Sequence, residues 1–261
     1  MVSLVDCTNE NFSEESFSNV RKFINANYKT DGELTFRTDA SSGKIIVDCS
    51  SSVELNRDIP KLQLTDGTFE WGEIKGDFNC RNYDNLTSLE GAPRKVNGTF
   101  YCSGCDNLTS LEGAPEVVTG SFYCYNCSKL KSLKGAPKEI GKNFSCNYCE
   151  ELESLEGAPK KVSGHFSCYA CHELKNLKGA PKEIGKNFSC YNCYSLESLE
   201  GAPKYVGKHF NCEFCDNLTS LKGAPKKVGG CFTCCYCPKL KSLEGAPEKV
   251  KRLDCDICLK Q

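Results

Sequence analysis

A 22-residue unit recurs along most of this sequence without insertion or deletion. Each unit contains the tripeptide Gly-Ala-Pro, whose proline returns every 22 residues, at Pro93, Pro115, Pro137, Pro159, Pro181, Pro203, Pro225 and Pro247. One extra residue in a unit would move every following side chain out of register with its neighbours. The constant length therefore predicts a solenoid, in which each unit forms one turn and stacks on the next.

The residues of one unit predict the shape of a turn. The consensus is F-x-C-x-x-C-x-x-L-x-x-L-x-G-A-P-x-x-[VI]-x-x-x. In Phe188-Ser189-Cys190, Phe and Cys alternate around a polar residue, which is typical of a short strand with Phe and Cys facing inward. Cys193 can face inward as well only if the chain bends between the two cysteines. The leucines and the Val or Ile complete the core, and Gly-Ala-Pro predicts a turn.

This unit resembles the short leucine-rich repeats of bacterial and bacteriophage-encoded proteins, which have L-x-x-L-x-x-[LG]-x-P-x-x-[LIV] words and a ladder of Asn or Cys. By this resemblance, which covers residues 76–258, Phe188 and Cys190 take the inward strand positions, Cys193 the ladder position and Leu196 the leucine after it. The sequence departs from the family in its strand Phe, in one extra residue after P-x-x-I and in Gly-Ala before Pro. A straighter β-solenoid is therefore an alternative to a curved one.

Residues 1–75 lack the repeat and predict a small α/β cap. Ser13 is placed to begin a helix over residues 15–28, which has one apolar face. Residues 33–50 read as two strands around an Ala-Ser-Ser-Gly turn. We expect this cap to cover the exposed edge of the first turn, with an independent domain as the alternative. The predicted fold is thus mainly β: a leucine-rich-repeat-like solenoid of about eight 22-residue turns over residues 76–261, behind an α/β cap.

The 21 cysteines of the chain allow three interpretations. Eight C-x-x-C pairs recur, and 18 residues separate successive pairs except before the last one, a spacing that zinc sites also use. Because the 22-residue period already dictates this gap, we interpret the pairs as a buried ladder of small apolar side chains. A zinc or iron-sulfur array and stacked disulfides are the alternatives. Cys231 and Cys235 break the pattern, and we expect them to be the more reactive thiols. No metal or cofactor is expected.

Composition and charge limit the classes of function. The net charge is −1, with 8 Lys and Arg against 14 Asp and Glu in residues 1–78 and 25 against 20 in the rest. We interpret this surplus as too diffuse for nucleic-acid binding, and no apolar run predicts a membrane span or a leader. The residue before each Gly-Ala-Pro is Glu or Lys, which predicts charge pairs between turns. The lack of a long apolar run predicts a cytoplasmic protein, and three surface histidines with no phosphate-binding loop predict a non-enzymatic one.

One group of outward positions is rich in aromatic residues. They are the residue between Phe and the first Cys and the two residues between the cysteines, 24 positions in the eight units from Asn79 to Tyr236. Eight are aromatic, about three times the number that the chain's 10% aromatic content predicts: Tyr101, Tyr123, Tyr125, Tyr148, Tyr169, Tyr191, Phe214 and Tyr236. Exposed aromatic clusters are typical of interaction surfaces. The alternative is that tyrosine simply suits strands and stacks on its neighbours.

We therefore predict a non-enzymatic scaffold that binds another macromolecule, a protein, through this aromatic face. The resemblance to phage and bacterial leucine-rich repeats implies the same kind of interaction role. A metal or redox protein that uses the C-x-x-C array is the rival class, and a purely structural assembly protein is the third.

Overall fold

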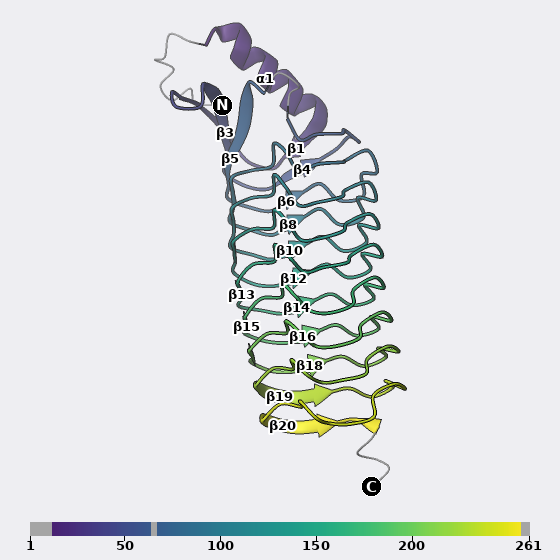
Figure 1. The fold of residues 1–261 in the computed structure, drawn as a ribbon. Helices are drawn as coiled ribbons and strands as arrows, with labels where there is room; N and C mark the ends of the chain where they lie inside the picture. Colours follow the sequence, from purple (N-terminus) through teal and green to yellow (C-terminus); the bar gives the residue numbers. More distant parts are fainter. Residues whose placement is uncertain (1–11, 64–66, 257–261) are drawn as a thin grey trace.

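The computed structural model describes residues 12–63 and 67–256 of the chain, which form a stack of similar turns beneath a helix (Figure 1). The N-terminal part contains α1 (Glu14–Asn27), β1 (Tyr28–Thr30), β2 (Leu34–Asp39), β3 (Lys44–Cys49), β4 (Val53–Leu55) and β5 (Phe69–Ile74). The Ser13 hydroxyl caps α1 by accepting a hydrogen bond from the backbone N–H of Ser16. Strands β2 and β3 pair as an antiparallel hairpin. The predicted helix and hairpin are both present.

Each repeated unit contributes two short strands joined by a bend. The strands at the Val or Ile position are β7 (Lys95–Val96), β9 (Val117–Val118), β11 (Glu139–Ile140), β13 (Lys161–Val162), β15 (Glu183–Ile184) and β17 (Tyr205–Val206). Those at the Phe position are β6 (Phe78–Asn79), β8 (Phe100–Tyr101), β10 (Phe122–Tyr123), β12 (Phe144–Ser145), β14 (Phe166–Ser167), β16 (Phe188–Ser189) and β18 (Phe210–Asn211). The two strands merge in the last two units, as β19 (Lys227–Thr233) and β20 (Lys249–Asp254).

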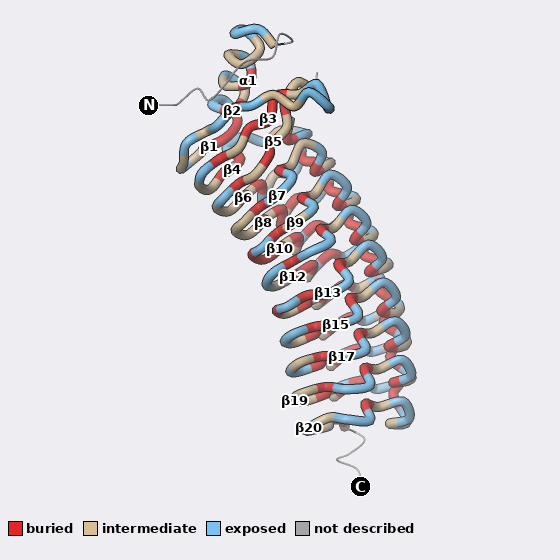
Figure 2. Tube along the Cα trace, turned by 90° about the vertical axis from the view of Figure 1, so that its left-hand side faces the viewer, coloured by how far each residue is buried: buried red, intermediate tan, exposed pale blue. Residues whose placement is uncertain are grey.

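The predicted solenoid is confirmed, with about nine turns of roughly 22 residues. Equivalent strands of successive turns pair in parallel with a constant register, for example Phe122 with Phe144 and Val96 with Val118. The stack bends gently along its length (Figure 2). Strands β4 and β3 pair in parallel with β6 and β5, so residues before the first Gly-Ala-Pro already belong to the stack.

Two antiparallel strands end the stack at its N-terminal side. Strand β1 pairs with β4 at the end of one parallel column, and β2 pairs with β3 at the end of the other. In α1, Val20 and Ile24 are fully buried against the core. These elements occupy backbone groups that an open edge would present to another chain. No helix among the described residues is long and apolar enough to span a membrane.

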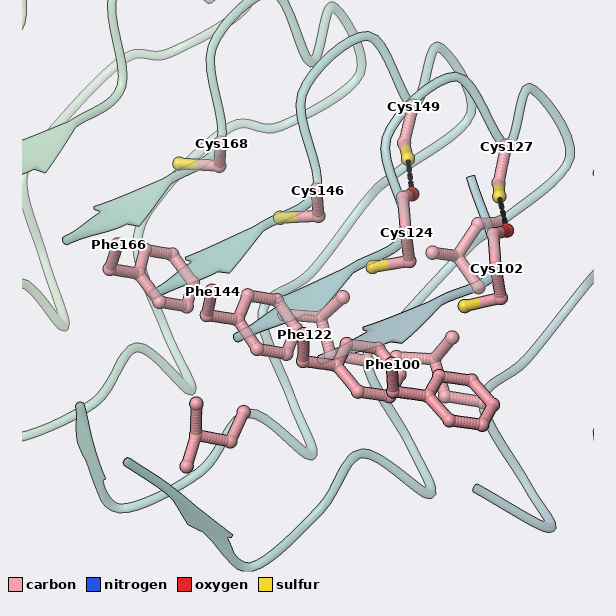
Figure 3. Close-up of a cluster of buried hydrophobic side chains, with 14 of the residues drawn as sticks. Phe100, Cys102, Phe122, Cys124, Cys127, Phe144, Cys146, Cys149, Phe166 and Cys168 are labelled. Carbon is pink, nitrogen blue, oxygen red and sulfur yellow. Dashed lines mark hydrogen bonds between the residues drawn. The ribbon is translucent and has the colours of Figure 1, made fainter. Parts of the chain in front are cut away.

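A ladder of phenylalanines runs through the core. Successive ring centroids are 5.0–5.4 Å apart, and each pair of rings lies within 12° of parallel. All eight rings are buried: Phe78, Phe100, Phe122, Phe144, Phe166, Phe188, Phe210 and Phe232. Figure 3 shows part of this ladder beside the cysteines. Burial of each ring contributes about 1.5–3 kcal/mol, so the ladder is a main source of stability.

The glycine of Gly-Ala-Pro is required by the distance between turns. Gly135, for example, has a φ of +91°, and a Cβ on it would lie 2.4 Å from the backbone nitrogen of Glu112 in the preceding turn. A side chain at this position is excluded by both conformation and contact. The short Gly-Ala step thus lets the turns pack at the strand spacing of about 4.8 Å.

Candidate functional site

The chain bends sharply between the two cysteines of each unit, as the sequence predicts. The second residue between them has a positive φ in all eight units, from +54° to +68°, including the first unit, in which Tyr83 replaces the second cysteine. The eight residues are Asn82, Gly104, Asn126, Tyr148, Ala170, Asn192, Phe214 and Tyr236. This left-handed bend turns the second cysteine back into the core, where Cys190 and Cys193 are both fully buried. We call this position the bend position.

The buried thiols bond to backbone carbonyls of neighbouring turns. The second cysteine of each unit donates to the carbonyl oxygen of the first cysteine one turn earlier, over 3.1–3.3 Å in seven units. Figure 3 shows two of these bonds, from Cys127 to Cys102 and from Cys149 to Cys124. Most first cysteines bond instead to a carbonyl of the next turn, as Cys190 does to Asn211 at 3.5 Å. The second cysteines therefore donate to carbonyls for which the described residues show no backbone donor, whereas the carbonyl of Asn211 already accepts the backbone N–H of Cys190.

Burial favours the protonated form of Cys105, Cys127 and Cys193. Burial raises the pKa of Cys105 to about 11 and that of Cys127 to about 12, and it raises the pKa of Cys193 well above its ordinary value. Because metal binding and nucleophilic attack both need the thiolate, this environment favours a structural role. The described cysteines are free, and no group of three metal-binding side chains gathers among the described residues.

The eight predicted aromatic side chains lie on one side of the cysteine turns, in two contacting groups. In the first group, Tyr123 contacts Tyr101 and Tyr125 at 5.5 and 6.3 Å between ring centroids. The second group is a continuous run of five rings over five turns, with centroids 4.4–5.1 Å apart: Tyr148, Tyr169, Tyr191, Phe214 and Tyr236. We call these eight residues the aromatic strip.

Three rings of the strip occupy the bend position and are the exposed ones. Tyr148, Phe214 and Tyr236 are 47%, 36% and 59% exposed, whereas the other five are half-buried. A left-handed backbone is costly for a bulky side chain and cheap for Gly or Asn. The chain uses Asn or Gly at this position in four other units, so the aromatic residues are not needed to form the bend.

Two exposed aromatics lie outside the predicted set. Tyr194 follows the second cysteine of its unit and stacks on His172 of the preceding turn, with centroids 4.5 Å apart. Tyr205 is 39% exposed on β17, with the Lys227 ammonium 5.4 Å from its ring centroid. The prediction considered only three outward positions in each unit, so neither residue could be found in that way. Tyr194, next to Cys193 in sequence, extends the aromatic character of the cysteine turns.

Two of the three histidines have a defined structural role that the sequence did not reveal. They belong to a column in which each side chain accepts a hydrogen bond from the backbone N–H one turn later. Asn143 Oδ1 accepts from His165, and His165 Nδ1 accepts from Asn187. The next pair repeats this pattern: Asn187 Oδ1 accepts from His209, and His209 Nδ1 accepts from Cys231. The histidines thus replace asparagine as acceptors in this column.

The remaining predictions on side chains concern charges and the two irregular cysteines. Charge pairs between turns are present before Gly-Ala-Pro, from Lys134 to Glu112 at 3.1 Å and from Lys178 to Glu200 at 3.3 Å. Cys231 and Cys235 are partly exposed, unlike the ladder cysteines.

Comparison with known proteins adds no relatives: no family model, curated protein or solved structure matches this sequence significantly. The resemblance to leucine-rich repeats stays a prediction, because the solenoid alone does not identify a family.

Proposed function

We propose that this protein is a non-enzymatic scaffold whose aromatic strip binds a partner protein. The observation that carries the proposal is the placement of Tyr148, Phe214 and Tyr236 at exposed bend positions with φ of +56°. Strained conformations cost about 1–3 kcal/mol each and cluster at functional sites. Here the strain is avoidable, because Asn192 serves the same bend without it. The cost therefore argues for selection by function.

The shape and chemistry of the strip fit a protein partner. Five contacting rings form a row about four turn spacings long, which combines apolar ring faces with the hydroxyl groups of four tyrosines. Tyrosine provides a large contact area, and its few rotatable side-chain bonds keep the loss of conformational entropy on binding small. Aromatic residues are also enriched at the energetic centres of protein interfaces. The rigid sheet beneath holds the rings in fixed positions, which lowers the entropy cost of binding.

Two other roles are weaker. Stacking between neighbouring rings supports a purely structural role, because each pair adds about 0.5–1.5 kcal/mol. For Tyr148, which has one such ring contact, that gain is of the same size as the cost of the strained bend, so stacking gives little reason to prefer Tyr over Asn at this position. A metal or redox role is opposed by thiols that are buried, protonated and bonded to carbonyls, as Cys127 is to Cys102. We place the protein in the cytoplasm, where such thiols stay reduced.

Replacement of the three exposed rings by asparagine tests the proposal. The variant Tyr148→Asn/Phe214→Asn/Tyr236→Asn introduces the residue that the chain itself uses at this bend in three other units. We expect it to melt at the same temperature as the parent or higher, and to lose at least tenfold in the amount of partner recovered by pull-down from extracts of the cells that produce it.

Tyr205→Lys provides the matched control, because it removes an exposed ring outside the strip from a position where other units have lysine. This control should recover as much partner as the parent. A triple variant that recovers the same proteins as the parent, or that melts many degrees lower, would show that the rings are structural.

A further inference from the structure

Eight lysines gather on the side of the solenoid that carries the Val and Ile strands. Five directly follow Gly-Ala-Pro in successive units, and three lie four residues further on. All eight are exposed: Lys138, Lys142, Lys160, Lys182, Lys186, Lys204, Lys208 and Lys226. We call them the lysine strip. At about 4.8 Å per turn, the strip is about 20 Å long.

The strip brings like charges together without compensation. The backbone N–H of Lys182 donates to the carbonyl of Lys160, and that of Lys204 to Lys182, both at 2.9 Å, so these residues are direct neighbours in adjacent turns, each just before a strand. Like charges in this position destabilise a sheet. Among the ion pairs of the described residues, none includes a lysine of the strip.

Another column of the same solenoid shows the arrangement that stability favours. Directly before Gly-Ala-Pro, Glu and Lys alternate from Glu112 to Glu244, and Lys134 and Lys178 each pair with a glutamate of a neighbouring turn. Directly after Gly-Ala-Pro, lysine occupies five turns in succession, with Glu116 before the run and Glu248 after it. Of these two columns, only the one directly after Gly-Ala-Pro has an arrangement of charges that lowers stability. This indicates that its lysines bind a ligand.

The surroundings of the strip leave room for such a ligand. A shallow groove of about 370 Å³ crosses its first turns, and its lining includes Lys138, Lys160 and Gly141. The two glutamates between the lysine columns, Glu139 and Glu183, are outnumbered, and Glu183 is paired with Lys161. The positive field of the strip also contributes, after burial, to the lowered pKa of His165, through Lys186 and Lys208.

We propose that the lysine strip binds the phosphate backbone of a nucleic acid without reading its sequence. A narrow row of cations matches a linear polyanion. Lysine provides point charges rather than the bidentate geometry that arginine uses for base edges, and the strip contains no arginine. A membrane surface fits less well, because stable anchoring needs an inserted apolar group beside the cations, and the strip's own residues supply none.

Counting charges along the sequence hides this surface and led to the opposite expectation. The repeated part has a surplus of only five positive charges. In the five units that carry the strip, however, the five residues after each proline contain ten lysines against two glutamates. The acidic residues that balance them lie in other columns.

The test uses the full chain and fluorescein-labelled 20-nucleotide probes, single-stranded and duplex, of mixed sequence. Fluorescence anisotropy at 50 mM salt should show binding of either probe with little dependence on its sequence. Affinity should fall about 100-fold between 50 and 200 mM salt, as expected for about five phosphate contacts to a single strand. Lys160→Glu/Lys204→Glu should weaken binding at least tenfold. This variant leaves the column with alternating charges, so it should fold at least as well as the parent.

The matched control changes the same net charge elsewhere. Lys129→Glu/Lys239→Glu removes two lysines that bond only to asparagine oxygens, those of Asn107 and Asn217. It should weaken binding less than threefold. Equal losses in both variants, or no binding of either probe at 50 mM salt, would overturn the proposal. So would stronger binding of poly-glutamate or of vesicles with 30% anionic lipid than of the oligonucleotides at equal charge concentration.

Discussion

The thiol of Cys127 donates a hydrogen bond to the carbonyl oxygen of Cys102, one turn earlier, over 3.2 Å. The same bond joins the cysteines of successive turns along the solenoid (Figure 3). It explains why C-x-x-C recurs in this protein: the left-handed bend between the cysteines leaves a carbonyl that needs a donor, and a small, weakly polar thiol supplies it within an apolar core.

The thiols should differ strongly in reactivity. Iodoacetamide at pH 8 should alkylate Cys231 first among the described cysteines, because it is partly exposed and interrupts the pattern. Cys190 and Cys193 should react at least 100-fold more slowly in the folded protein, since burial raises both pKa values well above the ordinary value. Peptide mass spectrometry over time measures each rate. Fast labelling of Cys193 without unfolding would contradict the buried ladder.

Loss of one ring from the phenylalanine ladder should be costly. Phe166→Ala removes a buried ring that stacks on Phe144 and Phe188, at 5.2 and 5.4 Å between centroids. We expect a loss of about 3–5 kcal/mol in the free energy of unfolding, from lost burial and the cavity that remains. Urea titration followed by circular dichroism measures it. The adjacent outward change Ser167→Ala should alter stability by less than about 0.5 kcal/mol, and a similarly small effect at Phe166 would show that the inward and outward faces are reversed.

Two glycines separate conformational strain from contact between turns. Gly135 has a φ of +91°, and the Cβ that Gly135→Ala adds would lie against the backbone of Glu112. Gly43 has a φ of +61°, and the Cβ that Gly43→Ala adds would have no atom within 4 Å. The first change should cost more than about 3 kcal/mol, and the second about 1 kcal/mol, the cost of the left-handed backbone alone. Thermal unfolding of both variants tests this, and equal costs would mean that the turns can separate to accommodate a methyl group.

The histidine column should make stability depend on pH. His165 Nδ1 accepts the N–H of Asn187, which requires the neutral ring, and burial with Lys186 and Lys208 lowers its pKa below the ordinary 6.5. Below pH 6.5 the unfolded chain therefore binds more protons than the folded one, so stability falls as pH drops from 6.5 toward the lowered value. Above pH 6.5 this effect is absent.

His165→Asn keeps the acceptor, as Asn143 does one turn earlier, and removes the titration. Melting temperatures between pH 7.5 and 5 should therefore fall less for this variant than for the parent. If the melting temperatures of the variant and the parent fall equally with pH, the contribution of His165 to acid sensitivity is negligible.

The 22-residue period predicts most of the fold, because each residue that faces the core recurs once in every repeat. Phe166, Leu155 and both cysteines of each pair were identified as core residues in this way. The bend was also recognised, although its left-handed backbone was not, and the recurrence of Asn82, Gly104 and Asn126 at one position was the available signal. The histidine column and the lysine strip were missed, because both depend on which outward residues become neighbours between turns.

The aromatic strip was found from composition alone, yet its best evidence came from the backbone. Enrichment of tyrosine cannot separate a binding surface from favourable stacking. The positive φ of Tyr148 and Tyr236 supports the proposal of a binding surface, since it attaches an avoidable cost to the side chain.

Site-specific photo-crosslinking tests the central claim most directly. A p-benzoylphenylalanine residue replaces Tyr148 in the strip or, as the control, Tyr205 outside it, and each protein is irradiated in extract from the producing cells. We expect one discrete crosslinked protein from position 148, absent from position 205, and lost when Phe214→Asn and Tyr236→Asn are added. The same faint mixture of products from both positions, unchanged by the asparagine substitutions, would contradict a specific partner at the aromatic strip.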